Sequence, residues 1–495
     1  VGARISGAFV FSGVVSGRFH EDFSGMTAKF FSWPEARRFY AIGLPIFIAQ
    51  MAQMGMSFAD TAMTGQFSAE AMAAVAVASS VWAPVLMLGI GCLLALPPLS
   101  AQLVGGGRAE GAAHLLRQGI WITLGVSLLL VAVLHAISRQ LEVFGLTPEL
   151  AHLAGGYLRA IMWGMPGFML FINMRSFLEG FSHTRPAMSI ALLGLALNVP
   201  CNYVLIYGKL GLEPMGAVGC GVASALCYWF MAACMFWHLR SAPHYAPLRP
   251  LFAPMLRPGL FHKAEPWLDG RLILRILRLG LPAALALCFE VSLFALSGIL
   301  LAPLGTVTVA GHQVALNVAS LIFVIPLSIG MTATIRVGRC LGARQVERAR
   351  LVARTALGLS VGSGIIIALL TFIFRHAIVR IYTHDADVMT LAAHLLCYQA
   401  AYQILDSVQT AGIGILRGYN DTRIISVICF VTYCVLGLPL GFLLARTDIL
   451  APAMGAAGFW VAYIVALGFG AACYLARVRS LHANSWENVL QRVGR

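Results

Sequence analysis

The sequence predicts an all-α membrane protein with twelve transmembrane helices in two six-helix lobes, which an internal parallel repeat relates. Three observations predict this fold: an extremely apolar composition, twelve long apolar runs, and motifs that recur at one nearly constant spacing. Of the 495 residues, 59% are hydrophobic and only 11% are charged, and the mean hydropathy is +0.82. Because a soluble domain carries about 25% charged residues, the composition excludes soluble enzymes, disordered chains and disulfide-rich secreted proteins.

The apolar runs are broken by Gly, Pro and charged segments, and each is long enough to span a bilayer as a helix. In the N-terminal half, helices are predicted near 39–63, 71–99, 115–137, 152–177, 186–207 and 215–239. In the C-terminal half, they are predicted near 276–302, 306–335, 352–374, 390–416, 424–445 and 454–476. The resulting domains are an arm at 1–35, an N-lobe at 36–240, a cytoplasmic linker at 241–271, a C-lobe at 272–478 and a tail at 479–495. Residues 1–25 fit either an over-extended reading frame with Met26 as the start or a cytoplasmic arm.

Three motifs of the first half recur in order in the second half. LGLP at 279–282 answers IGLP at 42–45, an offset of 237. The segments 414–424 and 454–464 answer 176–186 and 215–225, at offsets of 238 and 239. Because six helices separate the copies, both halves enter the membrane from the same side, which indicates a parallel repeat about the membrane normal.

The formal net charge of +14 is sorted along the chain. Most Lys and Arg residues lie in the N-terminal arm and in alternate loops, which predicts that both termini are cytoplasmic. This sorting argues against a nucleic-acid partner. No G-x-x-x-x-G-K-[ST] motif is present, so no ATP site is expected, and the 11 cysteines form no framework of pairs.

Three acidic residues lie within the apolar runs: Asp60, Glu290 and Asp406. A charge at the bilayer centre costs about 2.5–3.5 kcal/mol, so such residues normally face a bundle interior or water and serve a function. The alternatives are structural hydrogen bonding and, for Asp60, a solvated position near its helix end.

Polar side chains extend these positions into stripes at helical spacing. One stripe consists of Gln399, Tyr402, Asp406 and Gln409, and another of Gln50, Gln53, Ser57, Asp60 and Thr64. Gln313 and Asn317 lie one turn apart beside His312, which is either titratable or a hydrogen-bonded structural residue. In lipid these faces must turn inward. The alternative function is polar contact between packed helices.

Several segments resemble the multidrug and toxic compound extrusion (MATE) family, in its bacterial NorM-type branch. They include LPIFIAQMAQMGMSFADTAMTG at 44–65, LPAALALCFEVSLFALSGILLAPLG at 281–305 and QILDSVQTAGIGILRGYNDT at 403–422. The resemblance covers the chain from about Pro34 to Arg479. It implies a multidrug efflux antiporter of the bacterial inner membrane, which exchanges amphipathic, often cationic drugs and dyes for Na+ or H+ by alternating access.

The resemblance also implies site residues. The cation-coupling residues are Glu290, Asp406, Tyr402, Cys220 and Tyr433, with Na+ expected at the first three. Asp60 matches the first-helix acid of the N-lobe and is expected, with Gln53 and Ser57, to act as a relay or substrate contact. The remaining candidate substrate contacts are Gln313, Asn317, His312, Gln399 and Gln409. No cofactor is expected, and a monomer is.

If Glu290 and Asp406 share one cavity, the coupling ion and a cationic drug are alternatives for one negative site, which produces exchange. The sequence leaves Na+ and H+ both open. A lipid-linked saccharide flippase would require a strongly cationic cavity, and the helix centres carry almost no basic residues. A membrane-embedded hydrolase or transferase using Glu290, Asp406 and His312 would leave the repeat without a rationale.

Overall fold

The computed structural model describes residues 32–144, 146–242 and 268–483, and this part of the chain is helical without strands. The predicted arm, linker and tail therefore lie mostly outside the described residues. The first lobe contains α1 (Trp33–Phe67), α2 (Ala69–Leu93), α3 (Leu96–Gly105), α4 (Ala109–Ser138), α5 (Pro148–Ile161), α6 (Met165–Gly180), α7 (Arg185–Tyr207) and α8 (Gly216–Ser241). The second contains α10 (Gly270–Leu301), α11 (Thr306–Gly342), α12 (Val346–Tyr382), α13 (Ala386–Gly418), α14 (Thr422–Cys429), α15 (Leu438–Arg446) and α16 (Ala456–Ala483).

Eleven helical segments of the described chain are long and apolar enough to cross a membrane. The segment predicted as one helix at 152–177 is instead broken into α5, a 3₁₀ turn at Met162–Gly164 and α6. Pro166 lacks the N–H that would bond the carbonyl of Met162, which accounts for the break. Together α5 and α6 take the place of the twelfth predicted span.

Prolines interrupt a second predicted helix, 71–99. It ends as α2 at Leu93 and resumes as α3 at Leu96. Pro97 and Pro98 cannot donate to the carbonyls of Leu93 and Leu94, so the α-helical ladder stops there. In the segment predicted at 424–445, a π-helix at Phe430–Gly437 joins α14 to α15.

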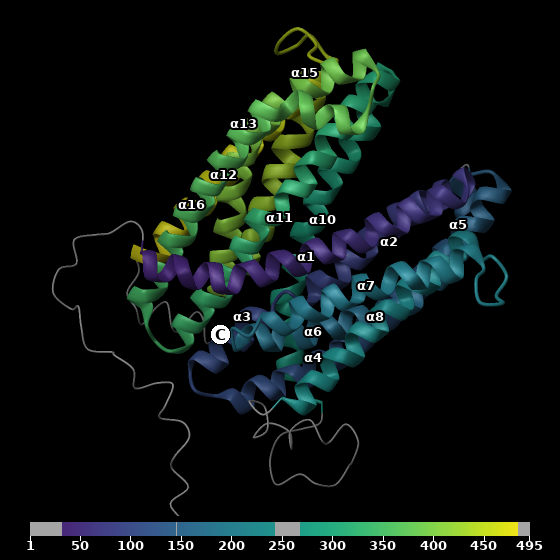
Figure 1. The fold of residues 1–495 in the computed structure, drawn as a ribbon. Helices are drawn as coiled ribbons and strands as arrows, with labels where there is room; N and C mark the ends of the chain where they lie inside the picture. The colour runs from purple at the N-terminus through teal and green to yellow at the C-terminus, as the bar shows by residue number, and fades with distance from the viewer. Residues whose placement is uncertain (1–31, 145, 243–267, 484–495) are drawn as a thin grey trace, which may run out of the picture.

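Each lobe has its own apolar core, and the lobes meet at only one end. We call this end, where α1 begins and α16 ends, the terminal side. There α3 packs on α11, α2 on α10, and the first half of α1 on α11. Figure 1 shows the lobes meeting at the terminal side and diverging toward the start of α5 and the end of α15.

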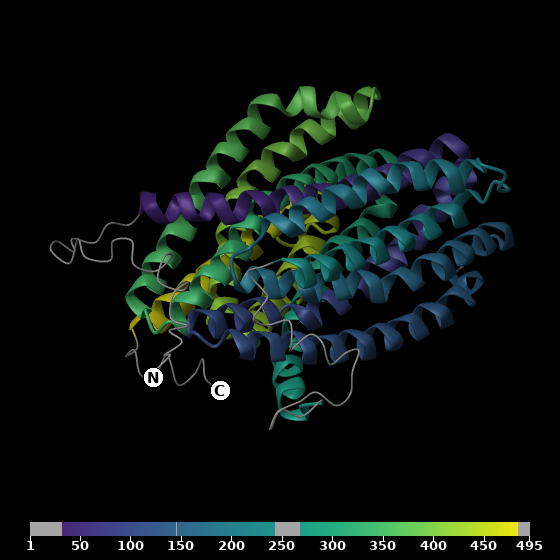
Figure 2. The ribbon, with the colours of Figure 1, turned by 60° about the horizontal axis from the view of Figure 1, so that its bottom comes forward.

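Glycines permit this close packing of the lobes. A Cβ atom added to Gly91 would lie 2.4 Å from the Cα of Ala284, and one added to Gly342 would lie 2.0 Å from the carbonyl oxygen of Gln102. Gly43 and Gly280, which the repeat relates, both face the opposite lobe, at Thr332 and Cys92. α1 and α10 therefore cross between the lobes in equivalent ways, as the turned view in Figure 2 also allows the reader to follow.

Candidate functional site

In the N-lobe, Asp60 lies at the centre of a cage of hydrogen-bond donors. Its Oδ1 accepts from Asn198 Nδ2 at 3.0 Å and from Asn202 Nδ2 at 2.6 Å, and its Oδ2 accepts from Ser224 Oγ at 2.7 Å. The Asp60 side chain is buried, so these bonds replace the water it would otherwise bind. We call Asp60, Asn198, Asn202 and Ser224 the Asp60 cage.

Three helices supply the Asp60 cage. α7 carries the two asparagines one turn apart on the face that packs against α1, and α8 supplies Ser224. The sequence analysis missed these three partners of Asp60. A signal was present, because two amides four residues apart in an otherwise apolar helix repeat the spacing that was recognised on other helices.

Cys220 belongs to the N-lobe, so its predicted place beside Glu290 and Asp406 is wrong. Its Sγ lies 4.0 Å from the carbonyl oxygen of Asp60. The physical reason is that α8 packs on α7 and α5 within the N-lobe core, which holds Cys220 away from the acids of α10 and α13.

In the C-lobe, the structure brings Glu290 on α10 and Asp406 on α13 into electrostatic range of each other. Asp406 is 1% exposed, and its Oδ2 has no hydrogen-bond partner within the described chain. Glu290 is half-buried and also interacts with Arg417, which the sequence analysis treated only as a helix end. This pair differs from the Asp60 cage because one of its buried carboxylate oxygens is left unsatisfied.

Tyrosines surround this acidic pair. Tyr402 and Tyr433 are both buried and both lie in electrostatic range of Glu290. The ring of Tyr402 packs edge-on against Trp460, with centroids 5.7 Å apart. The hydroxyl of Tyr433 accepts a hydrogen bond from Gln409 Nε2. The structure therefore groups four of the five predicted cation-coupling residues.

The predicted substrate contacts separate into two groups. Gln399, Gln409 and His312 are at most 1% exposed and lie sealed inside the C-lobe, where His312 Nε2 is 3.2 Å from Ser297 Oγ. Gln399 Nε2 donates to Gln403 Oε1. This structure therefore places these three where a drug cannot reach them.

The second group is accessible. Gln313 and Asn317 on α11 and Ser57 on α1 are exposed, and Gln53 is half-buried. Polar side chains exposed on membrane-spanning helices must face water or another helix. These four residues remain candidate substrate contacts.

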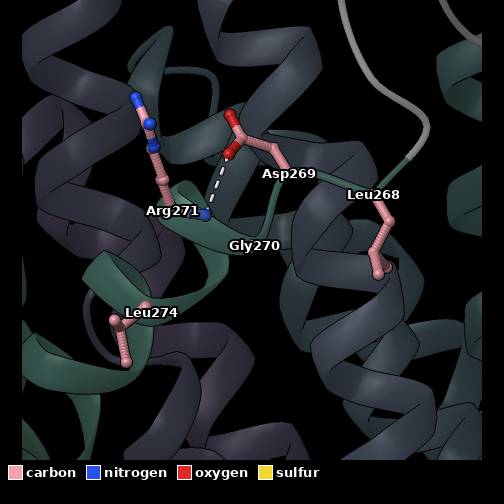
Figure 3. Close-up of a pocket in the computed structure, with 5 residues that line it drawn as sticks. All are labelled: Leu268, Asp269, Gly270, Arg271 and Leu274. Atoms are coloured by element: carbon pink, nitrogen blue, oxygen red, sulfur yellow. Dashed lines mark hydrogen bonds between the residues drawn. The ribbon is translucent and has the colours of Figure 1, made fainter.

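No group of three or more His, Cys, Asp or Glu residues that could hold a metal ion occurs in the described ranges. A pocket of about 660 Å³ lies at the start of α10, lined by Leu268, Asp269, Gly270, Arg271 and Leu274 (Figure 3). Its only carboxylate, Asp269, caps α10 by accepting from the backbone N–H groups of Leu272 and Arg271. The bond from Leu272 lowers the pKa of Asp269. Because that carboxylate is occupied with its helix, this pocket is not a cation site.

Comparison with known proteins gives a consistent result. A family model described as MatE matches residues 45–204 and 282–443. The multidrug resistance protein MdtK of Edwardsiella ictaluri (strain 93-146) is 46% identical over 94% of this chain and 99% of its own length. MdtK of Yersinia pestis (strain Pestoides F) is 44% identical over 92% of this chain and 98% of its own.

Solved structures share the fold. The eukaryotic MATE transporter AtDTX14 superposes with a TM-score of 0.82 at 19% identity, covering 93% of this chain and 98% of that one. A mutant of the Vibrio cholerae MATE transporter VcmN has a TM-score of 0.79 at 18% identity, covering 92% and 98%.

Proposed function

The chain belongs to the MatE family, and from this premise we propose that it is a multidrug efflux antiporter. It exports amphipathic, often cationic compounds in exchange for inward Na+ or H+. The observation that carries this proposal is the acidic pair in the C-lobe, in which a fully buried carboxylate oxygen of Asp406 lacks any partner beside Glu290. A cation or proton supplies what that oxygen lacks.

Exchange follows from electrostatics. Two carboxylates in a low-dielectric interior repel each other, and a positive charge bound between them relieves the repulsion. An inward-moving ion and an outward-moving cationic drug each supply that charge, so the binding of one opposes the binding of the other. Tyr402 and Tyr433 complete the oxygen-rich surroundings of this pair.

The Asp60 cage acts as the N-lobe relay in this proposal. Its carboxylate accepts three hydrogen bonds from neutral donors, an arrangement that favours the ionised form. The accessible side chains Gln53, Ser57, Gln313 and Asn317 lie on the two lobes and contact the drug.

Alternating access follows from the two-lobed plan. The basic loops assign the terminal side to the cytoplasm, so lobes that meet there form the outward-open state. Rocking the lobes about this contact exposes the sites inward. A membrane potential contributes about 2.3 kcal/mol per charge per 100 mV to ion entry. The protein works in the bacterial inner membrane, as a monomer with both termini cytoplasmic.

A dye-accumulation assay tests the proposal. Cells that express the protein should accumulate less ethidium, and Asp406→Asn or Glu290→Gln should restore accumulation because each removes one charge of the acidic pair. Asp387→Asn is the matched control, since Asp387 is an exposed acid in the first turn of the same α13. Normal export by both site variants would refute the acidic-pair mechanism. Vesicles with an imposed Na+ gradient or an imposed pH gradient then identify the coupling ion.

A further inference from the structure

A second set of unsatisfied oxygens lies one helical turn from Asp406. Gln409 Oε1 and Thr432 Oγ1 belong to residues that are each 1% exposed, and neither atom has a hydrogen-bond partner within the described chain. Buried polar atoms are nearly always paired, so two unpaired oxygens in one place indicate a missing ligand.

Gly470 on α16 shows that these two oxygens converge. A Cβ atom added to Gly470 would lie 2.5 Å from Gln409 Oε1 and 3.0 Å from Thr432 Oγ1. The oxygens thus approach a single point from α13 and from the π-helix, and only a residue without a side chain leaves that point free. We call Gln409, Thr432 and Gly470 the Gly470 cradle.

The surrounding structure fixes the oxygens in place. Gln409 Nε2 donates to the Tyr433 hydroxyl, so the amide is held with its oxygen toward Gly470. Thr432 and Tyr433 are adjacent in the π-helix Phe430–Gly437, whose wider turn changes which residues point inward. π-Helical turns are rare and occur frequently at functional sites.

The chemistry of these oxygens selects the ligand. An amide oxygen and a hydroxyl oxygen are hard, neutral donors, which suit an alkali cation such as Na+ and do not take up a proton near neutral pH. The carboxylate of Asp406, three residues before Gln409 on α13, supplies negative charge one turn away. We propose that the Gly470 cradle is a Na+-binding site, distinct in its ligands from the acidic pair. This proposal rests on the proposed antiport and assigns Na+ a place in it.

Equilibrium binding of radioactive Na+ to the purified full-length protein in liposomes, at fixed pH, tests the site. We expect saturable binding by the wild type and at least tenfold weaker binding by Thr432→Val, which keeps the side-chain shape but removes the oxygen. Thr432→Ser keeps the oxygen and should bind like the wild type. Gly470→Ala should weaken binding as strongly, since its methyl group displaces Gln409 Oε1.

Gly468→Ala is the matched control for Gly470→Ala. Its added Cβ would meet only Leu405 Cδ1, at 3.6 Å, which is an ordinary contact on the same helix. Loss of binding in Gly470→Ala with retention in Gly468→Ala supports the cradle. Wild-type binding by Thr432→Val and Gly470→Ala, or no Na+ binding by the wild type, would overturn it.

Ethidium export separates the failure of the cradle from the failure of antiport. If the wild type exports ethidium on a pH gradient but binds no Na+, the cradle proposal fails and the antiport proposal stands. If neither gradient drives export, the antiport proposal fails, and the cradle is then judged by the binding measurements alone.

Discussion

Two buried aspartates show how one repeated backbone holds two different kinds of chemistry. Asp60 receives three hydrogen bonds from amide and hydroxyl donors, whereas Asp406 keeps an unpaired oxygen. The offset of 237 places Ser297 at the position equivalent to Asp60, and Ser297 pairs with His312 instead of a carboxylate. The N-lobe site is therefore complete without a ligand, while the C-lobe site is not.

The Asp60 cage gives a stability prediction for Asn202→Ala. This change removes the 2.6 Å hydrogen bond to a buried carboxylate, and hydrogen bonds to charged groups contribute about 1.5–3 kcal/mol. We expect the free energy of unfolding in detergent to fall by about that amount, measured by thermal or denaturant unfolding. Asn317→Ala is the control, because Asn317 is an exposed amide in α11. An equal loss in both variants would contradict a specific role for the cage.

Individual residues also show what the sequence could and could not predict about the site. The three intramembrane acids were predictable because charge is costly in lipid wherever it lies. The partners of Asp60 and the wrong placement of Cys220 depend on which face of α7 and α8 turns toward α1. That orientation is set by packing between helices, which no single helix records in its own sequence.

At the scale of helices, the apolar runs predict where spans occur but not where they break. Pro97, Pro98 and Pro166 are visible in the sequence, yet proline in a membrane helix also occurs as a simple kink. Here α2 ends at Leu93 and α5 ends at Ile161. The π-helix at Phe430–Gly437 has no comparable sequence signal, because its residues are as apolar as those of the α-helices around it.

The break between α5 and α6 gives a packing prediction. A Cβ added to Gly164 would lie 2.7 Å from the backbone Cα of Ala225 on α8, and backbone cannot move aside cheaply. Gly164→Ala should therefore lower the free energy of unfolding by about 1–3 kcal/mol through overpacking. Gly125→Ala on α4 meets no atom within 4 Å and is the control. Equal melting temperatures for the two variants would show that this close approach is unimportant.

At the scale of the whole molecule, ionic contacts join the lobes across the terminal side. Glu35 on α1 is 2% exposed and accepts from Arg336 on α11, with both carboxylate oxygens 2.7 Å from Nη2. Arg348 on α12 approaches the same carboxylate at 3.4 Å, and Arg339 donates to Ser182 Oγ at 2.9 Å. Because these bonds connect opposite lobes, they stabilise the conformation in which the terminal side is closed.

Glu35→Gln should therefore shift the protein away from this conformation. The change leaves Arg336 and Arg348 without their shared negative charge, and loss of one partner of a buried ion pair costs about 3–5 kcal/mol. The population of the closed terminal side should fall at least tenfold, since about 1.4 kcal/mol corresponds to a factor of ten. Labels introduced as noncanonical amino acids at Glu149 and Ile449, on the diverging ends of the two lobes, would report a shorter distance between them. Glu347→Gln is the control because Glu347 is exposed and pairs with Arg350 within α12. An unchanged distance distribution in Glu35→Gln would show that the apolar and glycine contacts alone keep the terminal side closed.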